Sequence, residues 1–217
     1  MYIAIEGVIG VGKTTLARLL QPAFQASVLL EVFEENPFLS SFYSDRVRYA
    51  FQTQVFFLLS RYHQQRRTVQ DLLAQTENLI ADYTFEKDAL FAQINLSGDE
   101  LEMYFRVHEA LAEKIMIPDL VVFLRADTDL LMQRISSRDR PYERNMDRGY
   151  IDELNQAYEG FYTNQQERRS PVLAIDTNDL DYVKERAKLD WVETRIRQVL
   201  KMPPYQVELP LDIPINT

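Results

Sequence analysis

Residues 7–14 read Gly7-Val8-Ile9-Gly10-Val11-Gly12-Lys13-Thr14. They follow a short apolar run, Tyr2–Glu6, and open a helical pattern over Thr14–Phe24. The spacing G-x-x-x-x-G-K-[ST] between a strand and a helix is that of the phosphate-binding P-loop, whose backbone N–H groups surround an anion at a helix N-terminus. The alternative is a glycine-rich turn that binds nothing, and the strand-to-helix context favours nucleotide binding.

The P-loop also predicts which of its residues contact the nucleotide. Lys13 brings a positive charge to the β- and γ-phosphates and is expected to act in catalysis, while the Thr14 hydroxyl is placed to ligate Mg²⁺. The motif indicates a nucleoside triphosphate as the phosphate donor and says nothing about the acceptor. The loop residues expected to bind ATP are Gly7, Gly10, Val11, Gly12, Lys13, Thr14 and Thr15.

Outward from the loop, apolar runs alternate with helical patterns. This order predicts a P-loop NTPase-like three-layer α/β/α fold, in which helices cover both faces of a five-stranded parallel sheet. The predicted strands are Tyr2–Glu6, Val28–Val32, Asn78–Asp82, Asp119–Arg125 and Val172–Asp176. The predicted helices are Thr14–Phe24, Arg46–Leu73, one capped by Ser97 and ending about Ile115, one from about Asp129, one over about Tyr150–Gln166, and Tyr182–Leu200.

Parallel sheets of this kind bind ligands at the carboxyl ends of their strands. The P-loop, Glu31, Asp82 and the loops after Arg125 and Asp176 follow those ends. We therefore expect all of them on one rim of the sheet.

Length and composition limit the other possibilities. A chain of 217 residues suits a single domain, which we place at residues 1–200, before a proline-rich tail over residues 201–217. The net charge of −9 argues against DNA or RNA polymers as partners, because they require a basic surface. No apolar stretch reaches the roughly 18 residues of a membrane span. With no cysteine and no visible signal peptide, a cytoplasmic protein is expected.

Several further stretches, in order along the chain, resemble the deoxynucleoside kinase family, especially its bacterial deoxyguanosine and deoxyadenosine kinase branch. The stretches around Gln54–Arg61 and the R-I-x-x-R-x-R segment are the most specific. The resemblance implies transfer of the ATP γ-phosphate to a nucleoside 5′-hydroxyl, a P-loop kinase domain and, usually, a homodimer. The similar stretches are Ile5–Leu16, Glu31–Leu39, Phe51–Gln64, Ile80–Ala92, Pro118–Leu124 and Arg134–Glu143.

Glu31 is the candidate catalytic base. It is expected at the end of the second strand and matches the family glutamate that accepts the 5′-hydroxyl proton. A carboxylate beside the phosphate rim can orient and deprotonate an alcohol as it attacks. Glu34 and Glu35 are close competitors, and the spacing of Glu31 to Asn36 favours Glu31.

Three residues match the family's base site. Gln54 and Arg61 are seven residues apart, so they project from one face of a helix. The amide of Gln54 can pair with an adenine or cytosine edge, and Arg61 matches a second base-edge residue. Phe91 aligns with the aromatic residue that stacks on the base. The alternatives are a polar stripe for the first two, a core position for Phe91, and Gln52 in place of Gln54.

The sugar and metal sites follow from the same resemblance. Tyr43 and Glu143 match the pair that binds the sugar 3′-hydroxyl. Asp82 matches the acidic residue that holds the hydration shell of Mg²⁺. Many members have an arginine after that residue, whereas this chain has Tyr83. Whether Lys87 replaces the missing arginine is left open by the sequence.

Arg134, Arg138 and Arg140 match the family's lid over the phosphates. Three guanidinium groups do not form a core, so the alternative is a solvated basic patch. In an acidic protein, arginines near the rim are well suited to neutralise a transferring phosphoryl group. Arg138 is the expected charge stabiliser.

Two other functions share parts of this pattern. A nucleoside monophosphate kinase has the P-loop and arginine lid, but Glu31 and the acidic residues behind it disfavour an acceptor that is itself a phosphate. A non-catalytic nucleotide-binding subunit has the fold without the chemistry, and the intact Lys13, Thr14, Glu31 and Asp82 disfavour it. The sequence therefore favours an uncharged deoxynucleoside as the acceptor. The resemblance to the deoxyguanosine and deoxyadenosine kinase branch implies that this substrate is a purine deoxynucleoside, deoxyguanosine or deoxyadenosine.

Overall fold

The centre of the fold is the strand β1, Tyr2–Glu6, in which every residue is buried. The computed structural model describes residues 1–33, 35–144, 146–163 and 169–203, so residues 204–217 of the proline-rich tail lie outside it. All strand pairs are parallel, in the order β2-β3-β1-β4-β5. The other strands are β2 (Ser27–Leu29), β3 (Leu79–Ala81), β4 (Leu120–Arg125) and β5 (Val172–Asp176).

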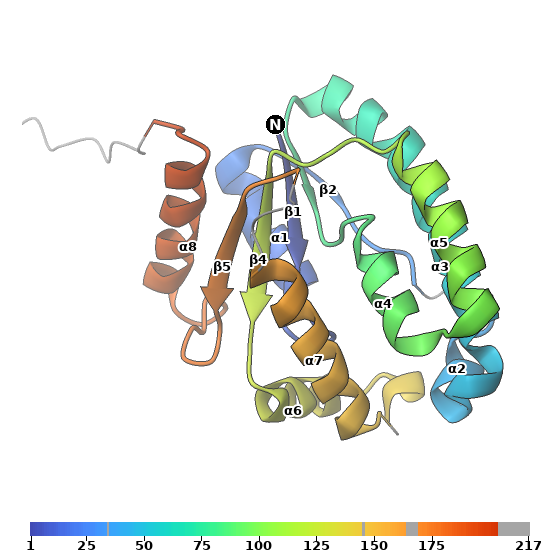
Figure 1. Ribbon diagram of the computed structural model, residues 1–217. Helices are drawn as coiled ribbons and strands as arrows, with labels where there is room; N and C mark the ends of the chain where they lie inside the picture. Colours follow the sequence, from blue (N-terminus) through green and yellow to red (C-terminus); the bar gives the residue numbers. More distant parts are fainter. Residues whose placement is uncertain (34, 145, 164–168, 204–217) are drawn as a thin grey trace, which may run out of the picture.

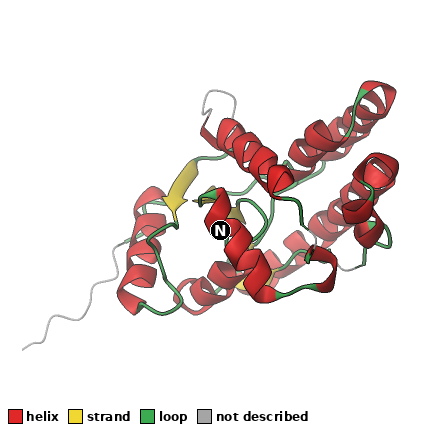
Figure 2. Ribbon diagram, turned by 90° about the horizontal axis from the view of Figure 1, so that it is seen from below, coloured by secondary structure: helices red, strands yellow, loops and turns green. Residues whose placement is uncertain are grey.

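Helices cover both faces of the sheet, as the sequence predicts. In Figure 1, α7 crosses in front of the strands and α1 lies behind them, while α8 and the α3–α5 pair lie on opposite sides. Seen from below in Figure 2, helices surround the short strands. The helices are α1 (Lys13–Phe24), α2 (Leu39–Ser44), α3 (Arg46–Thr76), α4 (Lys87–Asn95), α5 (Gly98–Ala112), α6 (Thr128–Arg138), the 3₁₀ helix η1 (Pro141–Glu143), α7 (Arg148–Thr163) and α8 (Arg186–Val199).

The second strand is shorter than predicted. Its partner β3 ends at Ala81, which pairs with Leu29, so the ladder has no further partner. The backbone N–H of Glu31 instead donates to the Asp82 side chain at 2.7 Å. The prediction that Glu31 ends the strand is therefore wrong by two residues, although Glu31 still lies at the predicted rim.

Other helix boundaries also differ from the prediction. The last helix starts at Arg186, not Tyr182, because the Asp181 carboxylate accepts the backbone N–H groups of Val183 and Lys184 in a turn. Ser97 precedes α5 but makes no side-chain capping hydrogen bond. The helices α2 and α4 were not predicted, since both are short. The predicted end of α7 at Gln166 lies outside the described residues.

Within the described part of the chain, no helix combines the length and apolar character needed to cross a membrane.

Gly7 connects β1 to the P-loop where two backbones pass very close. Its φ of +144° lies in a region that L side chains rarely adopt, and a Cβ there would stand 2.5 Å from the carbonyl oxygen of Leu124 in β4. Backbone in the middle of the sheet cannot move away easily. Glycine is therefore required for the loop to leave the strand in this direction.

We predict that Gly7→Ala lowers the free energy of unfolding by about 2 kcal/mol or more, because strain and a backbone clash add together. Gly160→Ala is the matched control. Gly160 lies on α7, where an added Cβ would meet no atom within 4 Å, so alanine there should stabilise by about 0.5–1 kcal/mol. Urea unfolding of both variants measures the difference, and equal stabilities would contradict the role of Gly7.

Candidate active site

Two adjoining hollows lie at the carboxyl edge of the sheet and share the P-loop. One extends over the P-loop toward the lid arginines and residues 177–183. The other extends toward α3 and α4. Both are lined by Gly10, Lys13, Thr14, Arg138 and Arg140, so they meet at these residues.

The structure brings nearly all the predicted site residues to these hollows. The P-loop side holds Val11, Gly12, Thr15 and Arg134. Gly7 is buried at the start of the loop and lines neither hollow. The predicted acceptor residues that line the second hollow are Glu31, Tyr43, Gln54, Arg61, Asp82, Phe91 and Glu143.

The P-loop lysine is folded back onto its own loop. Lys13 Nζ donates to the carbonyl oxygens of Gly7 at 2.6 Å and Val8 at 3.1 Å. Burial, followed by the positive charge of Lys87, lowers the pKa of Lys13 to about 8. A phosphate anion in the loop would replace these carbonyl contacts and favour the charged amine.

Asp82, the residue directly after β3, connects the P-loop to Glu31. Its Oδ2 accepts a hydrogen bond from the Thr14 hydroxyl, and its Oδ1 accepts the backbone N–H of Glu31. The two residues predicted to hold Mg²⁺, Thr14 and Asp82, are therefore in direct contact.

Glu31 is held between two cations. Its Oε1 accepts from Arg61 Nη2 at 2.6 Å, and its Oε2 accepts from Lys87 Nζ at 2.5 Å. Arg61 also forms an ion pair with the buried Asp88. Burial favours the neutral form of Glu31, but the charges of Lys87 and Arg61 outweigh it and lower the pKa to about 2. Glu31 is therefore a fixed carboxylate at neutral pH.

The competing residues lie elsewhere. Gln54 is buried on α3 and lines the second hollow, whereas Gln52 is exposed and does not. Glu35 is exposed and lines neither hollow, and Glu34 lies outside the described residues. Position in the second hollow thus distinguishes Gln54 from Gln52 and Glu31 from Glu35.

Aromatic rings form part of the acceptor side. The Tyr43 ring stacks on Tyr142 with centroids 6.3 Å apart. Burial raises the pKa of Tyr43 well above its ordinary value, so the phenol stays a hydrogen-bond donor. Phe91 is partly buried, and Lys87 Nζ lies 5.5 Å from the centre of its ring.

The arginines predicted to form the lid already have partners in the protein. Arg138 makes a two-pronged contact with Glu143 at 2.6 and 2.7 Å. Arg134 donates to the carbonyl oxygen of Val11 at 3.2 Å and also contacts Thr177. Arg134 therefore supports the P-loop backbone directly, while Arg138 is joined to the residue predicted to bind the sugar.

Sequence reasoning missed several side chains that organise the site. Asp88 forms an ion pair with Arg61 and orients it. The only sequence feature that could have identified Asp88 is its acidic side chain within the Ile80–Ala92 stretch. Glu6 is fully buried and accepts from the backbone N–H groups of Gly7 at 3.1 Å and Thr84 at 2.5 Å. Burial raises the pKa of Glu6, which Lys87 and Lys13 oppose. The sequence feature that could have identified Glu6 is a carboxylate at the end of an otherwise apolar strand.

A P-loop that opens onto a carboxylate-lined pocket at this edge of a parallel sheet is typical of P-loop phosphotransferases. Comparison with known families gives a more specific result. The family model described as "Deoxynucleoside kinase" matches residues 3–201. The chain therefore belongs to the deoxynucleoside kinase family, and it is an ATP-dependent kinase.

Individual relatives agree with this family. A deoxyguanosine kinase from Bacillus subtilis is 32% identical over 201 residues, which cover 92% of the chain and 97% of that protein. A deoxyguanosine kinase from Lactobacillus acidophilus is 30% identical over 219 residues, covering 93% of each. The solved structure of a deoxyadenosine kinase from M. mycoides with bound dATP superposes with a TM-score of 0.78 at 26% identity, covering 91% of the chain and 100% of that protein. The predicted family and fold class are confirmed.

The charges around Glu31 predict a pH-dependent contribution to stability. Glu31→Gln should lower the free energy of unfolding by about 3 kcal/mol at pH 7, because Lys87 loses its buried partner. The folded pKa of about 2 lies below the ordinary value of 4.5. The difference in the free energy of unfolding between wild type and variant should therefore have its full size above pH 4.5 and disappear as the pH falls toward 2.

Urea unfolding of both proteins at pH 7, 4.5 and 3 measures this difference, and the other carboxyl groups cancel in the comparison. A difference that stays constant down to pH 3 would contradict the ion pairs of Glu31.

Proposed function

We propose that the protein transfers the γ-phosphoryl group of ATP to the 5′-hydroxyl of a deoxyribonucleoside, with a purine preferred, in nucleotide salvage. The observation that carries the proposal is the position of Glu31. This carboxylate lines the pocket that meets the P-loop at Lys13 and Thr14. A sugar hydroxyl bound there has a proton acceptor on one side and the phosphoryl donor on the other.

In the proposed reaction, Glu31 orients the 5′-hydroxyl and accepts its proton. The 5′-oxygen forms a bond to the γ-phosphorus, and the bond between that phosphorus and the oxygen of the leaving ADP breaks. Lys13 and the P-loop N–H groups hold the phosphates. Arg138, once it leaves Glu143, neutralises the transferring phosphoryl group.

Mg²⁺ fits the residues at the donor side. Hard oxygen ligands suit it, and it keeps several waters, so one hydroxyl and one carboxylate beside ATP suffice. Thr14 and Asp82 supply these oxygens. No group of three or more His, Cys, Asp or Glu able to hold a metal occurs among the described residues, consistent with a metal bound largely through the nucleotide. When bound, Mg²⁺ would neutralise phosphate charge.

For the acceptor, we propose that Gln54 and Arg61 recognise the base edge and Phe91 stacks on it. Tyr43 and Glu143 would bind the 3′-hydroxyl, with Glu143 exchanging Arg138 for the sugar. The purine preference is supported by relatives and a solved structure that are named for deoxyguanosine and deoxyadenosine.

An uncharged acceptor also suits the charges in the pocket. Arg61 and Lys87 are paired with Glu31, and Arg138 is paired with Glu143. A nucleoside monophosphate would bring two negative charges toward Glu31 and Asp82, which disfavours it. The charges of the pocket therefore favour a nucleoside kinase over a thymidylate-like kinase.

The function can be tested by following ADP release with saturating ATP and Mg²⁺. The four deoxynucleosides and their monophosphates serve as separate acceptors, followed by a competition among the deoxynucleosides. We expect turnover with deoxynucleosides, fastest with deoxyguanosine or deoxyadenosine. Turnover with monophosphates alone would support the thymidylate-like alternative, and none with any acceptor would support a binding subunit.

Glu31→Gln should lower turnover by at least about 10²-fold with a modest change in nucleoside binding, because the amide still orients the hydroxyl but accepts no proton. Steady-state kinetics and nucleoside titration measure the two effects. Glu35→Gln is the control, since Glu35 is exposed and lines neither hollow. Near-normal turnover of Glu31→Gln would remove the base role from this residue.

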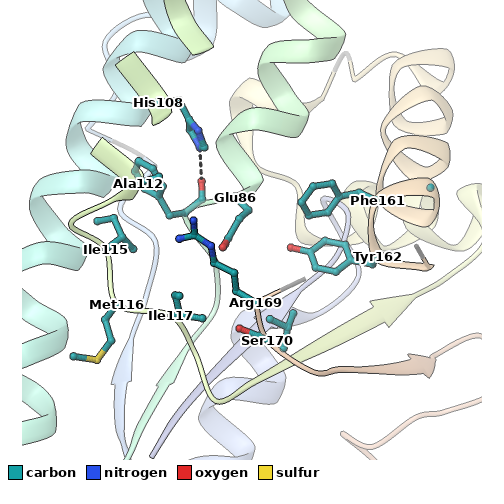
Figure 3. A pocket seen from close by; sticks show the side chains of 13 residues that line it. Glu86, His108, Ala112, Ile115, Met116, Ile117, Phe161, Tyr162, Arg169 and Ser170 are labelled. Atoms are coloured by element: carbon teal, nitrogen blue, oxygen red, sulfur yellow. Dashed lines mark hydrogen bonds between the residues drawn. The ribbon is translucent and has the colours of Figure 1, made fainter. Parts of the chain in front are cut away.

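We also propose one kinase domain over residues 1–200 that works in the cytoplasm as a homodimer. The family match over residues 3–201 supports the domain. Large apolar side chains are exposed on α5 and the turn after it: Met103, Val107, Met116 and Ile117. A cavity of about 390 Å³ lies beside this turn. In Figure 3, Met116 and Ile117 lie on one side of it and Phe161 and Tyr162 of α7 on the other. A second copy would cover this surface.

The substitution of both Met103 and Val107 by Glu should therefore convert a dimer to a monomer, because charges on the covered face disfavour burial. Sedimentation equilibrium measures the mass of each variant. Val199→Glu on α8, at the opposite side of the molecule in Figure 1, should leave the dimer intact. A wild-type protein that is a monomer at all concentrations would exclude the dimer.

A further inference from the structure

Lys87 lies where physical chemistry disfavours an ammonium group. It is the first residue of α4 and only 6% exposed. Burial penalises a charged amine, and the positive end of a helix dipole penalises it further. A lysine retained under both penalties needs a compensating interaction, and a charged group inside a substrate pocket is a candidate for function.

The ammonium group contacts the proposed catalytic base and lies in the hollow that P-loop residues also line. Lys87 Nζ is 2.5 Å from Glu31 Oε2, and Lys87 lines the same hollow as Lys13 and Thr14.

The two cations that hold Glu31 differ in the number of protein groups that they contact. Arg61 is fixed by both Glu31 and Asp88. Within the described residues, Lys87 Nζ donates one hydrogen bond, to Glu31, whereas an ammonium group carries three donors. Lys87 therefore has N–H groups to offer a ligand in the pocket.

The neighbouring side chains of this segment point elsewhere. Tyr83 is fully buried, and its hydroxyl donates to Gln64 Oε1 at 2.6 Å. Glu86 lines the separate cavity of Figure 3. Between Asp82 and Asp88, Lys87 is the residue that brings a cation into the acceptor hollow.

We propose that Lys87 is a catalytic residue whose ammonium group contacts the phosphoryl group during its transfer, as well as holding Glu31. This inference rests on the proposed kinase reaction. As the 5′-oxygen bonds to the γ-phosphorus and ADP departs, the hydroxyl proton passes to Glu31. The ammonium group of Lys87 directs its remaining donors at the phosphoryl oxygens, where negative charge is concentrated.

The first test compares Lys87→Met with Lys87→Arg. The methionine variant should lose about 10²–10³-fold in kcat, as expected for a lost charge stabiliser, with both KM values within about threefold of wild type. Arginine should recover part of the loss. Lys201→Met is the control for net charge. Lys201 is exposed and lines neither hollow.

A second test separates contact with the phosphoryl group from mere positioning of Glu31. If Lys87 only oriented Glu31, Lys87→Met would have no further effect in a Glu31→Gln background. We expect a further loss of at least about tenfold in that background, because the phosphoryl contact is independent of the base. Equal turnover of the single Glu31→Gln and the double variant would overturn the proposal.

The absence of cysteine from the chain permits a chemical rescue that controls for folding. Lys87→Cys, alkylated while unfolded and then refolded, gains an ammonium group from 2-bromoethylamine and a neutral amide from iodoacetamide. Only the aminoethylated protein should recover turnover, by at least about tenfold. Equal turnover of the two alkylated proteins, or wild-type turnover of Lys87→Met, would overturn the role of Lys87. Inactivity of the wild type with every deoxynucleoside would instead overturn the proposed function.

Discussion

The Glu31 carboxylate lies between two cations, and the arrangement of the acceptor pocket depends on these contacts. A carboxylate removed from water needs its charge compensated, and Arg61 and Lys87 do so from different helices. Arg61 is itself oriented by Asp88, the residue after Lys87. The first turn of α4 therefore provides both a cation for Glu31 and the anion that fixes the second cation. The position of α4 determines how charge is distributed around a bound hydroxyl group.

The parallel sheet makes this local chemistry possible. Because β1, β2 and β3 run in the same direction, the P-loop, Glu31 and Asp82 emerge at one edge. Asp82 uses both of its oxygens, one for the Thr14 hydroxyl and one for the backbone of Glu31. The P-loop hydroxyl and the backbone of Glu31 are thus joined through one side chain.

The sequence predicts those parts of the structure that depend on local pattern. The P-loop motif and the apolar runs determine the fold class, and the order of the strand ends predicts the rim. The predicted end of β2 was wrong because the length of this strand depends on where its partner β3 ends. The local sequence pattern contains no information about that partner. The ion pairs Arg61–Asp88 and Arg138–Glu143 were not predicted for a related reason. In the sequence, each of these charged residues is equally compatible with a solvent-exposed position. The short helices α2 and α4 contain too few turns to show a helical period.

Glu6 has a consequence for how the two substrates are aligned. Its carboxylate accepts hydrogen bonds from the backbone N–H of Gly7 and from the backbone N–H and hydroxyl of Thr84. The hydroxyl of Tyr158 on α7 also donates to it at 3.4 Å. The P-loop and the segment that leads into α4 are therefore both hydrogen-bonded to the same buried carboxylate. Their separation is fixed when the chain folds, and the entropy of bringing the reacting groups into line is lost before either substrate arrives.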